Sequence, residues 1–371
     1  MLCACVPEDC PLVPGLTAAQ CEVVRAMELP AALPPARGNA KADDVETAWF
    51  GFKLFFDARL SGNQEVRCAT CHIPERAFDD GRPTSVGLAP VTRNSPSTYL
   101  SAWQHWQMWD GRADSLWSQP LLALEDPREM NFSRLELAHL MARSFAQPYE
   151  ASFGPLPDTL SSWPPAGRPG DAAFDGLAEA DRHEVNRIAA NVGKALEAYL
   201  RKAAHGRGRF DDFLAGDAAQ LSAEEQRGLR AFFEAGCDAC HRGPRLSDDG
   251  FYDVGVQPAE GQAPERGRAA ALEMLATSPF SSAGPFFDGE PGSVPAPVAA
   301  DENAWKTPSL RNVRRTAPYG HNGTHATLES IVELHTPAGA LDDEARAALL
   351  AFLRALDCAD PPSPWNNWPD R

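Results

Sequence analysis

The sequence predicts a mainly helical protein with two domains and long loops. Apolar residues recur at helical intervals in several segments, strand patterns are scarce, and 33 prolines and 28 glycines interrupt the chain. A length of 371 residues exceeds one typical hydrophobic core. Two stretches are also alike, "GFKLFF" at 51–56 and "GLRAFF" at 228–233, which suggests an internal duplication.

The helices are predicted from periodicity and end signals. Apolar residues recur at helical spacing from Val45 to Phe56, and Ser222 and Glu225 have capping-box spacing before "GLRAFF". Three further segments are expected to be helical: 186–204, 327–336 and 342–356. Two Pro/Gly-rich stretches are expected to be long loops: 155–171 and 281–301. We predict an N-terminal extension and two domains, with a hinge at His205 to Arg209: 1–38, 39–205 and 206–371.

The formal net charge of -17 argues against nucleic acid or an anionic membrane surface as a partner, because both would repel this chain. No apolar run approaches the roughly 20 residues that span a bilayer. We expect a periplasmic or otherwise exported protein whose signal peptide is absent from this chain, since the first 20 residues lack the basic start and apolar middle of one.

Nine cysteines are many for a cytosolic protein. Four lie in the motifs described next, and the others are Cys3, Cys5, Cys10, Cys21 and Cys358. The four near the N-terminus are candidates for disulfides in an oxidising compartment, and Cys3 is also a candidate lipid-bearing terminus. Their pairing cannot be read from the sequence.

Two CxxCH motifs predict the cofactor. They are "CATCH" and "CDACH", with the residues Cys68, Cys71, His72, Cys237, Cys240 and His241. In such a motif two thiols attach to the vinyl groups of a c-type haem and the histidine ligates its iron. Structural zinc is the alternative, but zinc ligand pairs usually lie within about 20 residues of each other, unlike these. The prediction becomes two cytochrome c-like helical domains, each with one covalent haem.

Two longer segments carry a family resemblance: "WDGRADSLWSQPLLALEDPREM" between the motifs and "TPSLRNVRRTAPYGHNGTHATLE" after them. Over roughly residues 45 to 357 the chain resembles the bacterial diheme cytochrome c peroxidases and MauG. The segment "ERGRAAALEMLATSPFSSAG" looks most like the branch that contains MbnH, the diheme enzyme of methanobactin operons.

The resemblance implies a direction for the chemistry. Hydrogen peroxide would react at the N-terminal haem, held by His72, and oxidising equivalents would pass to the C-terminal haem, held by His241. Trp109, before "DGR", matches the bridging tryptophan of the family, although a tryptophan here could also be an ordinary core residue. Gln119 and Glu129 match the distal pair, and Glu129 would be the acid-base catalyst rather than a surface carboxylate.

Three further assignments follow from the resemblance. Leu88 matches a loop histidine that closes the first iron in the classical peroxidases, so this iron should be open to peroxide. His335 matches the far axial ligand of the second iron, which is methionine in the peroxidases and tyrosine in MauG. The alternative for His335 is a half-buried residue at a helix end, and His321 and His325 are nearby competitors.

The resemblance also implies a calcium ion between the domains, with Asn94, Thr316 and Pro318 matching its protein ligands. MauG has a tryptophan two residues before its second CxxCH that carries oxidation to its protein substrate, and this chain has Ala235 there. The exit route must therefore differ, with three unranked candidates: Trp103, Trp106 and Trp305.

Three functions are considered. The first is a peroxide-dependent diheme oxidase of MauG/MbnH type, which would form a high-valent diheme state and oxidise a partner protein by long-range electron transfer. The MbnH branch suggests oxidation of tryptophan to kynurenine on a copper-binding partner. The alternatives are a cytochrome c peroxidase that takes electrons from a small cytochrome or cupredoxin, and a diheme electron-transfer cytochrome without peroxide chemistry.

Overall fold

The structure is a computed structural model that describes residues 10–203 and 206–365. The chain is mainly helical in these ranges, as predicted. The α-helices are α1 Ala18–Arg25, α2 Val45–Phe55, α3 Cys68–Cys71, α4 Gln119–Glu125, α5 Arg134–Ser144, α6 Ala146–Phe153, α7 Ala172–Asp175, α8 Glu179–Ala203, α9 Arg209–Leu214, α10 Ala223–Glu234, α11 Arg268–Ala276, α12 Leu328–His335 and α13 Asp343–Arg354. Two short strands, β1 Phe251–Tyr252 and β2 Trp305–Lys306, pair antiparallel.

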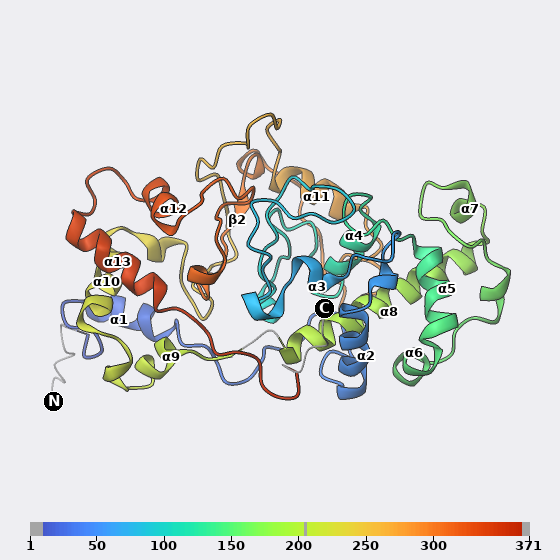
Figure 1. Cartoon of the computed structure of the whole chain (residues 1–371), viewed down its shortest axis with the longest axis horizontal. Helices are drawn as coiled ribbons and strands as arrows, with labels where there is room; N and C mark the ends of the chain where they lie inside the picture. The colour runs from blue at the N-terminus through green and yellow to red at the C-terminus, as the bar shows by residue number, and fades with distance from the viewer. Residues whose placement is uncertain (1–9, 204–205, 366–371) are drawn as a thin grey trace.

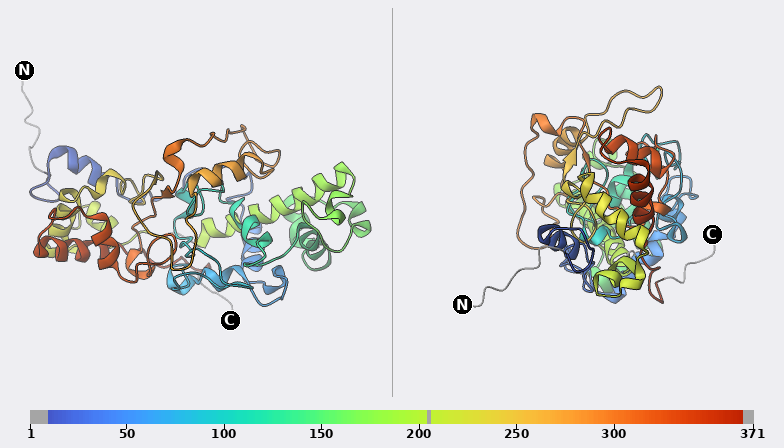
Figure 2. Two further views of the ribbon diagram at one scale, coloured as in Figure 1. Left: turned by 90° about the horizontal axis from the view of Figure 1, so that it is seen from above. Right: turned by 90° about the vertical axis from the view of Figure 1, so that its left-hand side faces the viewer.

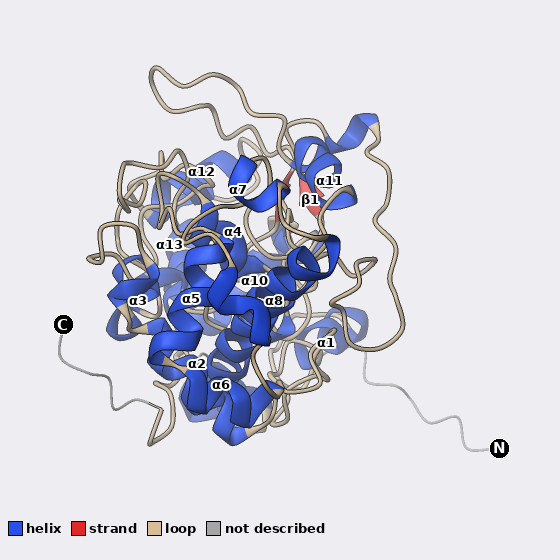
Figure 3. Ribbon diagram, turned by 90° about the vertical axis from the view of Figure 1, so that its right-hand side faces the viewer, coloured by secondary structure: helices blue, strands red, loops and turns tan. Residues whose placement is uncertain are grey.

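The helices form two lobes that lie side by side along the long axis (Figures 1 and 2). The N-terminal lobe is built around α2 and α8, and the C-terminal lobe around α10 and α13, each with its own cluster of buried apolar residues. Loops wrap around the helices, and the two short strands are the only sheet in the described ranges (Figure 3). None of the described helices is long and apolar enough to cross a membrane.

The repeated segments make the same kind of helix contact in the two lobes. A Cβ added to Gly51 of α2 would lie 1.8 Å from the carbonyl oxygen of Ala195 in α8. A Cβ added to Gly228 of α10 would lie 2.0 Å from the carbonyl oxygen of Ala348 in α13. In each lobe, therefore, the glycine lets two helices cross at a distance that no side chain permits.

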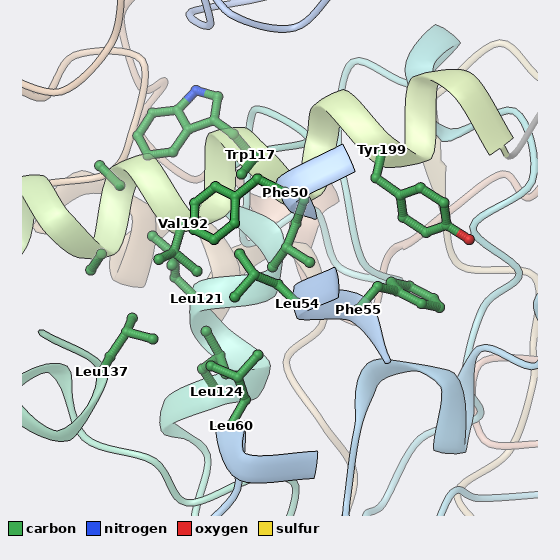
Figure 4. Close-up of a cluster of buried hydrophobic side chains, with 14 of the residues drawn as sticks. Phe50, Leu54, Phe55, Leu60, Trp117, Leu121, Leu124, Leu137, Val192 and Tyr199 are labelled. Carbon is green, nitrogen blue, oxygen red and sulfur yellow. The ribbon is translucent and has the colours of Figure 1, made fainter. Parts of the chain in front are cut away.

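Apolar side chains on both sides of the glycine fill the core of each lobe. In the N-terminal lobe, Phe50 and Leu54 of α2 lie near Val192 of α8, and the ring of Phe55 lies 5.1 Å from that of Tyr199 (Figure 4). In the C-terminal lobe, the rings of Phe232 in α10 and Phe352 in α13 lie 5.8 Å apart. Burial of a large apolar side chain contributes about 1.5–3 kcal/mol, so these contacts are a main source of stability.

The predicted helix ends are found where their side chains can cap them. Ser222 Oγ accepts a hydrogen bond from the Glu225 amide, and the Glu225 carboxylate accepts one from the Ser222 amide at 2.8 Å. This capping box starts α10. The first repeat differs as expected, because α2 ends at Phe55 and a loop leads to Cys68.

The N-terminal segment packs onto the C-terminal lobe. Cys10 and Cys21 form a disulfide inside its apolar cluster. A fully buried ion pair between Arg311 and Asp211 supports this packing, since Arg311 also donates to the Met27 carbonyl and Asp211 accepts from the Leu29 amide. Cys358 is buried and free. The division at residues 38 and 205 stays a prediction; Cys3, Cys5 and His205 lie outside the described residues.

One segment of the C-terminal half crosses to the other lobe. Phe280 and Phe286, which follow α11, belong to the apolar cluster of the N-terminal lobe. Lys194 of α8 forms an ion pair of 2.7 Å with Asp288 in the same segment. Figure 1 shows α11 on the side of α4 and α8. The lobes are therefore joined by packing as well as by the chain.

Replacing Gly228 by alanine tests the close helix crossing. In an open helix this change would stabilise the protein by about 1 kcal/mol. Here we expect a loss of about 1–3 kcal/mol in the free energy of unfolding, because the new methyl group overlaps the Ala348 carbonyl. Chemical denaturation measures it, with Arg227→Ala on the exposed face of α10 as the control. An unchanged or raised stability of Gly228→Ala would contradict the prediction.

Candidate functional site

A cavity of about 730 Å³ lies between the lobes and is lined by both CxxCH motifs. Nearly all predicted site residues line it: Cys71, His72, Asn94, Trp109, Gln119, Glu129, Cys237, Cys240, His241, Thr316, Pro318 and His335. Cys68 lines a smaller adjoining pocket together with Cys71 and His72. The fold thus brings together side chains that are far apart in the sequence.

The first motif presents His72 with one ring nitrogen already engaged. Cys68–Cys71 form the short helix α3, and His72 follows it. His72 Nδ1 lies 3.3 Å from the Phe78 carbonyl oxygen and 3.3 Å from Ser95 Oγ. A carbonyl only accepts, so Nδ1 carries the proton and Nε2 keeps its lone pair for a metal. Burial lowers the pKa of His72, which also favours the neutral ligand.

The second motif repeats this arrangement. His241 Nδ1 lies 2.9 Å from the Leu246 carbonyl oxygen, which leaves Nε2 as the free nitrogen. Burial, assisted by the nearby His335 imidazole and opposed by the Leu246 hydrogen bond, lowers the pKa of His241 to about 4. Both histidines are therefore neutral near pH 7 and suited to bind iron.

The four cysteines of the motifs are free thiols at the cavity or its adjoining pocket. Burial raises the pKa of Cys68 and of Cys71 to about 12. Within the described residues, no three histidine, cysteine or acidic side chains gather in a group that could hold a metal ion.

Buried cations at the second motif also fit a haem. Lys306 lines the cavity, and burial, assisted by nearby Arg245, lowers the pKa of Lys306 to about 7. Arg245 is itself buried and bonds Asp249 at 2.7 Å, but its Nη1 has no partner. Asp249 is one carboxylate beside two buried basic groups, Arg245 and Lys306. The propionates of a haem would neutralise the remaining positive charge. Neither Lys306 nor Arg245 lies in a sequence motif that points to haem binding.

Trp109 lies in the cavity wall and is fixed by two hydrogen bonds. Its indole N–H donates to the Asn94 carbonyl at 2.9 Å, and its own carbonyl accepts from the Lys306 amide at 2.7 Å. The first bond orients the ring and the second ties its backbone to β2. This placement agrees with a bridging role, which stays a prediction.

Gln119 and Glu129 face the first motif. Both line the main cavity and the adjoining pocket, together with Cys71 and His72. Gln119 is the first residue of α4, and Glu129 lies in the turn after it. Burial raises the pKa of Glu129, although Arg112 opposes this shift. A carboxyl group with a raised pKa can both take up and return a proton near neutral pH.

Leu88 does not line the cavity, contrary to what its match to a distal loop residue suggests. Its amide donates to the Glu129 carbonyl at 3.0 Å, and its side chain packs against the N-terminal core. The neighbouring Gly87 lines the cavity instead, where an added Cβ would lie 2.4 Å from the Glu129 carbonyl oxygen. At positions 87 and 88 the loop therefore presents no side chain that could bind the first iron.

His335 is the last residue of α12 and lies exposed at the cavity rim. Its Nδ1 is 2.9 Å from the Ile331 carbonyl oxygen, so Nε2 is free, as in His72 and His241. The exposure of His335 exceeds that of the half-buried helix-end residue considered as its alternative, and Leu328 is the only buried residue of α12. The competitor His321 stacks on Trp305 with ring centroids 3.7 Å apart, while His325 does not line the cavity.

The predicted calcium ligands surround one corner of the cavity. The side-chain nitrogen Nδ2 of Asn94 lies 2.9 Å from the Arg82 carbonyl oxygen and 3.5 Å from the Pro318 carbonyl oxygen. The carbonyl oxygens of Arg82 and Pro318 thus point at the side-chain nitrogen of Asn94 and not at its oxygen. Thr316 Oγ1 donates to the Val313 carbonyl. Calcium needs oxygen ligands at about 2.3–2.6 Å, so this site stays a prediction.

Two of the candidate exit tryptophans lie beside cations. The Arg268 guanidinium is 3.7 Å from the ring centroid of Trp106, and that of Arg93 is 4.8 Å from Trp305. A nearby cation disfavours removal of an electron from an indole, because the oxidised ring would be positive. Ala235 and Trp305 line the cavity, whereas Trp103 is half-buried against the N-terminal core.

Comparisons with known proteins show the family. Residues 46–219 match the family model of the di-haem cytochrome c peroxidases. MauG of Methylorubrum extorquens is 30% identical, with 88% of this chain and 82% of that protein aligned. Cytochrome c551 peroxidase of Pseudomonas aeruginosa is 30% identical, with 84% of this chain and 78% of that protein aligned.

Solved structures show the same fold. A MauG-like protein associated with microbial copper homeostasis has a TM-score of 0.63 at 28% identity, covering 91% of this chain and 97% of that one. The diheme peroxidase BthA of Burkholderia thailandensis has a TM-score of 0.66 at 20% identity, with 92% of both chains covered.

A helical fold with two CxxCH motifs around one cavity defines a diheme c-type oxidoreductase. The chain belongs to the family of di-haem cytochrome c peroxidases and MauG, enzymes that act with peroxide and carry two c-type haems.

Replacing His335 by alanine tests the second axial ligand. If His241 and His335 bind the same iron, low-temperature EPR of the ferric holoprotein should show one high-spin and one low-spin haem, and the low-spin signal should disappear in His335→Ala. His325→Ala is the control, since His325 does not line the cavity. A low-spin signal that survives in His335→Ala and disappears in His321→Ala would assign the ligand to His321.

Replacing Glu129 by glutamine tests the proton carrier. Below its raised pKa Glu129 is protonated and cannot accept a proton from peroxide, so the rate of reaction with peroxide should rise with pH through a value above 4.5. Glu129→Gln should slow this step by about 10²–10⁴-fold and remove the pH dependence. Stopped-flow spectroscopy over a pH series measures both. An unchanged rate would contradict this role and favour a plain electron carrier.

Proposed function

We propose that this enzyme is a peroxide-dependent diheme oxidase of MauG/MbnH type that oxidises a partner protein by long-range electron transfer. The observation that carries the proposal is the shared cavity, which both motifs and the hydrogen-bonded Trp109 line. When bound, the haems supply iron that reacts with peroxide and accepts electrons. We assign Cys68, Cys71 and His72 to one haem, and to the other Cys237, Cys240, His241 and His335.

The residues of the cavity have separate tasks in this proposal. Glu129 takes a proton from one oxygen of peroxide and returns one to the other oxygen, which leaves as water. The Gln119 amide, beside it, can hold the peroxide by a hydrogen bond. Trp109 shortens the path for electrons that move from the second motif to the first. Calcium at Asn94, Thr316 and Pro318 would hold the lobes together across this corner.

The nature of the partner rests on the likeness to the copper-homeostasis protein. We propose a periplasmic copper-binding protein in which a tryptophan is oxidised to kynurenine, as the resemblance to the MbnH branch implies. A histidine at position 335 supports this choice over a peroxidase, because imidazole donates more strongly to ferric iron than a methionine thioether does.

The main alternative is a peroxidase that reduces hydrogen peroxide to water with electrons from a small cytochrome or cupredoxin. The similarity to cytochrome c551 peroxidase favours this second function. A diheme electron-transfer cytochrome is the third, and it predicts no effect of Glu129→Gln.

Mass spectrometry distinguishes these functions. The holoprotein, peroxide and a copper-binding protein encoded beside it should yield kynurenine in tryptophan peptides of the partner, whereas peroxide alone or partner alone should not. Turnover of reduced cytochrome c in the same preparation provides the comparison. Fast oxidation of cytochrome c without any modified residue in the copper protein would overturn the oxidase and establish the peroxidase.

A further inference from the structure

Tyr252 occupies an unusual place, at the junction of the cavity wall, the second motif and solvent. It lines the cavity, yet 39% of its surface is exposed. Its hydroxyl lies beside the thiol of Cys240. None of the expected exit residues combines contact with a haem attachment site and exposure to solvent in this way.

The hydroxyl of Tyr252 has a proton acceptor. It donates to Asp248 Oδ2 at 2.8 Å, while the other oxygen of Asp248 accepts from the Gly250 amide at 2.8 Å. The hydrogen bond to Asp248 raises the pKa of Tyr252 to about 12, so the phenol keeps its proton at rest. The Asp248 side chain is 8% exposed, and its amide donates to the Cys240 carbonyl, which holds it beside the motif.

The short sheet connects Tyr252 to the residues between the motifs. Tyr252 of β1 pairs with Trp305 of β2, and the next amide, that of Lys306, donates to the Trp109 carbonyl. Val254 and Met274 line the cavity and are 39% and 53% exposed. Charged side chains also stand near Tyr252, since Asp253 is exposed and Arg242, 58% exposed, lies 3.7 Å from Asp248 Oδ2. A protein partner can therefore meet both apolar and charged groups around the phenol.

We propose that Tyr252 is the residue through which oxidising equivalents leave the cavity toward the partner protein, with Asp248 as its proton acceptor. This inference rests on the proposed function. One electron leaves Tyr252 for the second haem site while its phenolic proton moves to Asp248, giving a neutral tyrosyl radical and a protonated carboxyl. An electron from the partner and the proton from Asp248 then restore the phenol. One hydrogen peroxide takes up two electrons, one from each of two such cycles, and two protons, which the oxidised partner releases through solvent, to form two waters.

Neighbouring aromatic residues suit this role less well. Trp106 and Trp305 carry guanidinium groups over their rings, which oppose a positive charge on the indole. Tyr319 also lines the cavity, but its hydroxyl donates to the Val313 carbonyl, which cannot take up the proton. Tyr319 is therefore the matched control.

The test traps the radical in the holoprotein. Peroxide is added without partner in the presence of a nitroso spin trap, and peptide mass spectrometry locates the adduct. We expect the adduct on Tyr252 in the wild type and in Tyr319→Phe, and its loss in Tyr252→Phe. Oxidation of the partner should slow in Tyr252→Phe. In Asp248→Asn it should slow by about 100-fold, the usual contribution of a positioned base.

The outcomes separate this inference from the proposed function. An adduct on another residue, together with equal partner oxidation by the wild type and Tyr252→Phe, would overturn the role of Tyr252 while leaving the oxidase intact. Wild-type rates in Asp248→Asn would overturn the proton transfer. If even the wild type leaves the partner unmodified, the proposed function fails, and the trapping result alone then decides whether Tyr252 loses an electron.

Discussion

The hydrogen bonds that hold Trp109 determine how the two halves of the site face each other. The backbone N–H of Lys306 donates to the Trp109 carbonyl, and the Trp109 indole donates to the Asn94 carbonyl. The backbone N–H of Asn94 in turn donates to the His321 carbonyl. Two of these bonds cross from one half of the chain to the other. Backbone groups in a buried wall need partners, so a shift of one lobe would break several bonds at once.

Buried charges reinforce the same junction. Arg93 bonds Asp110 at 2.6 Å and also pairs with Glu265 from the other half of the chain. Although burial opposes it, Arg112 and Arg93 lower the pKa of Asp110, so this carboxylate stays charged. Loss of one partner would leave a buried charge unpaired, which usually costs several kcal/mol. The junction therefore favours one arrangement of the lobes.

In the proposed function the cavity separates proton chemistry from electron exchange. Glu129 and Gln119 lie half-buried at the first motif, while Tyr252 and His335 lie exposed at the second motif. Peroxide needs a small, enclosed site with one proton carrier, whereas a protein partner needs an exposed surface. An enzyme that acts on a protein too large for its cavity benefits from this separation.

Periodicity, fixed spacing and local motifs were enough to predict the helices and the family from the sequence, and the two CxxCH motifs predict the haem-binding residues. Which side chains of a loop face the cavity depends on tertiary packing, so Gly87 lies where Leu88 was expected. The positions of Lys306 and Tyr252 in the cavity wall were not predicted, because contacts between segments far apart in the chain create them. Burial, pairing and exposure depend on such contacts and cannot be read from neighbouring residues.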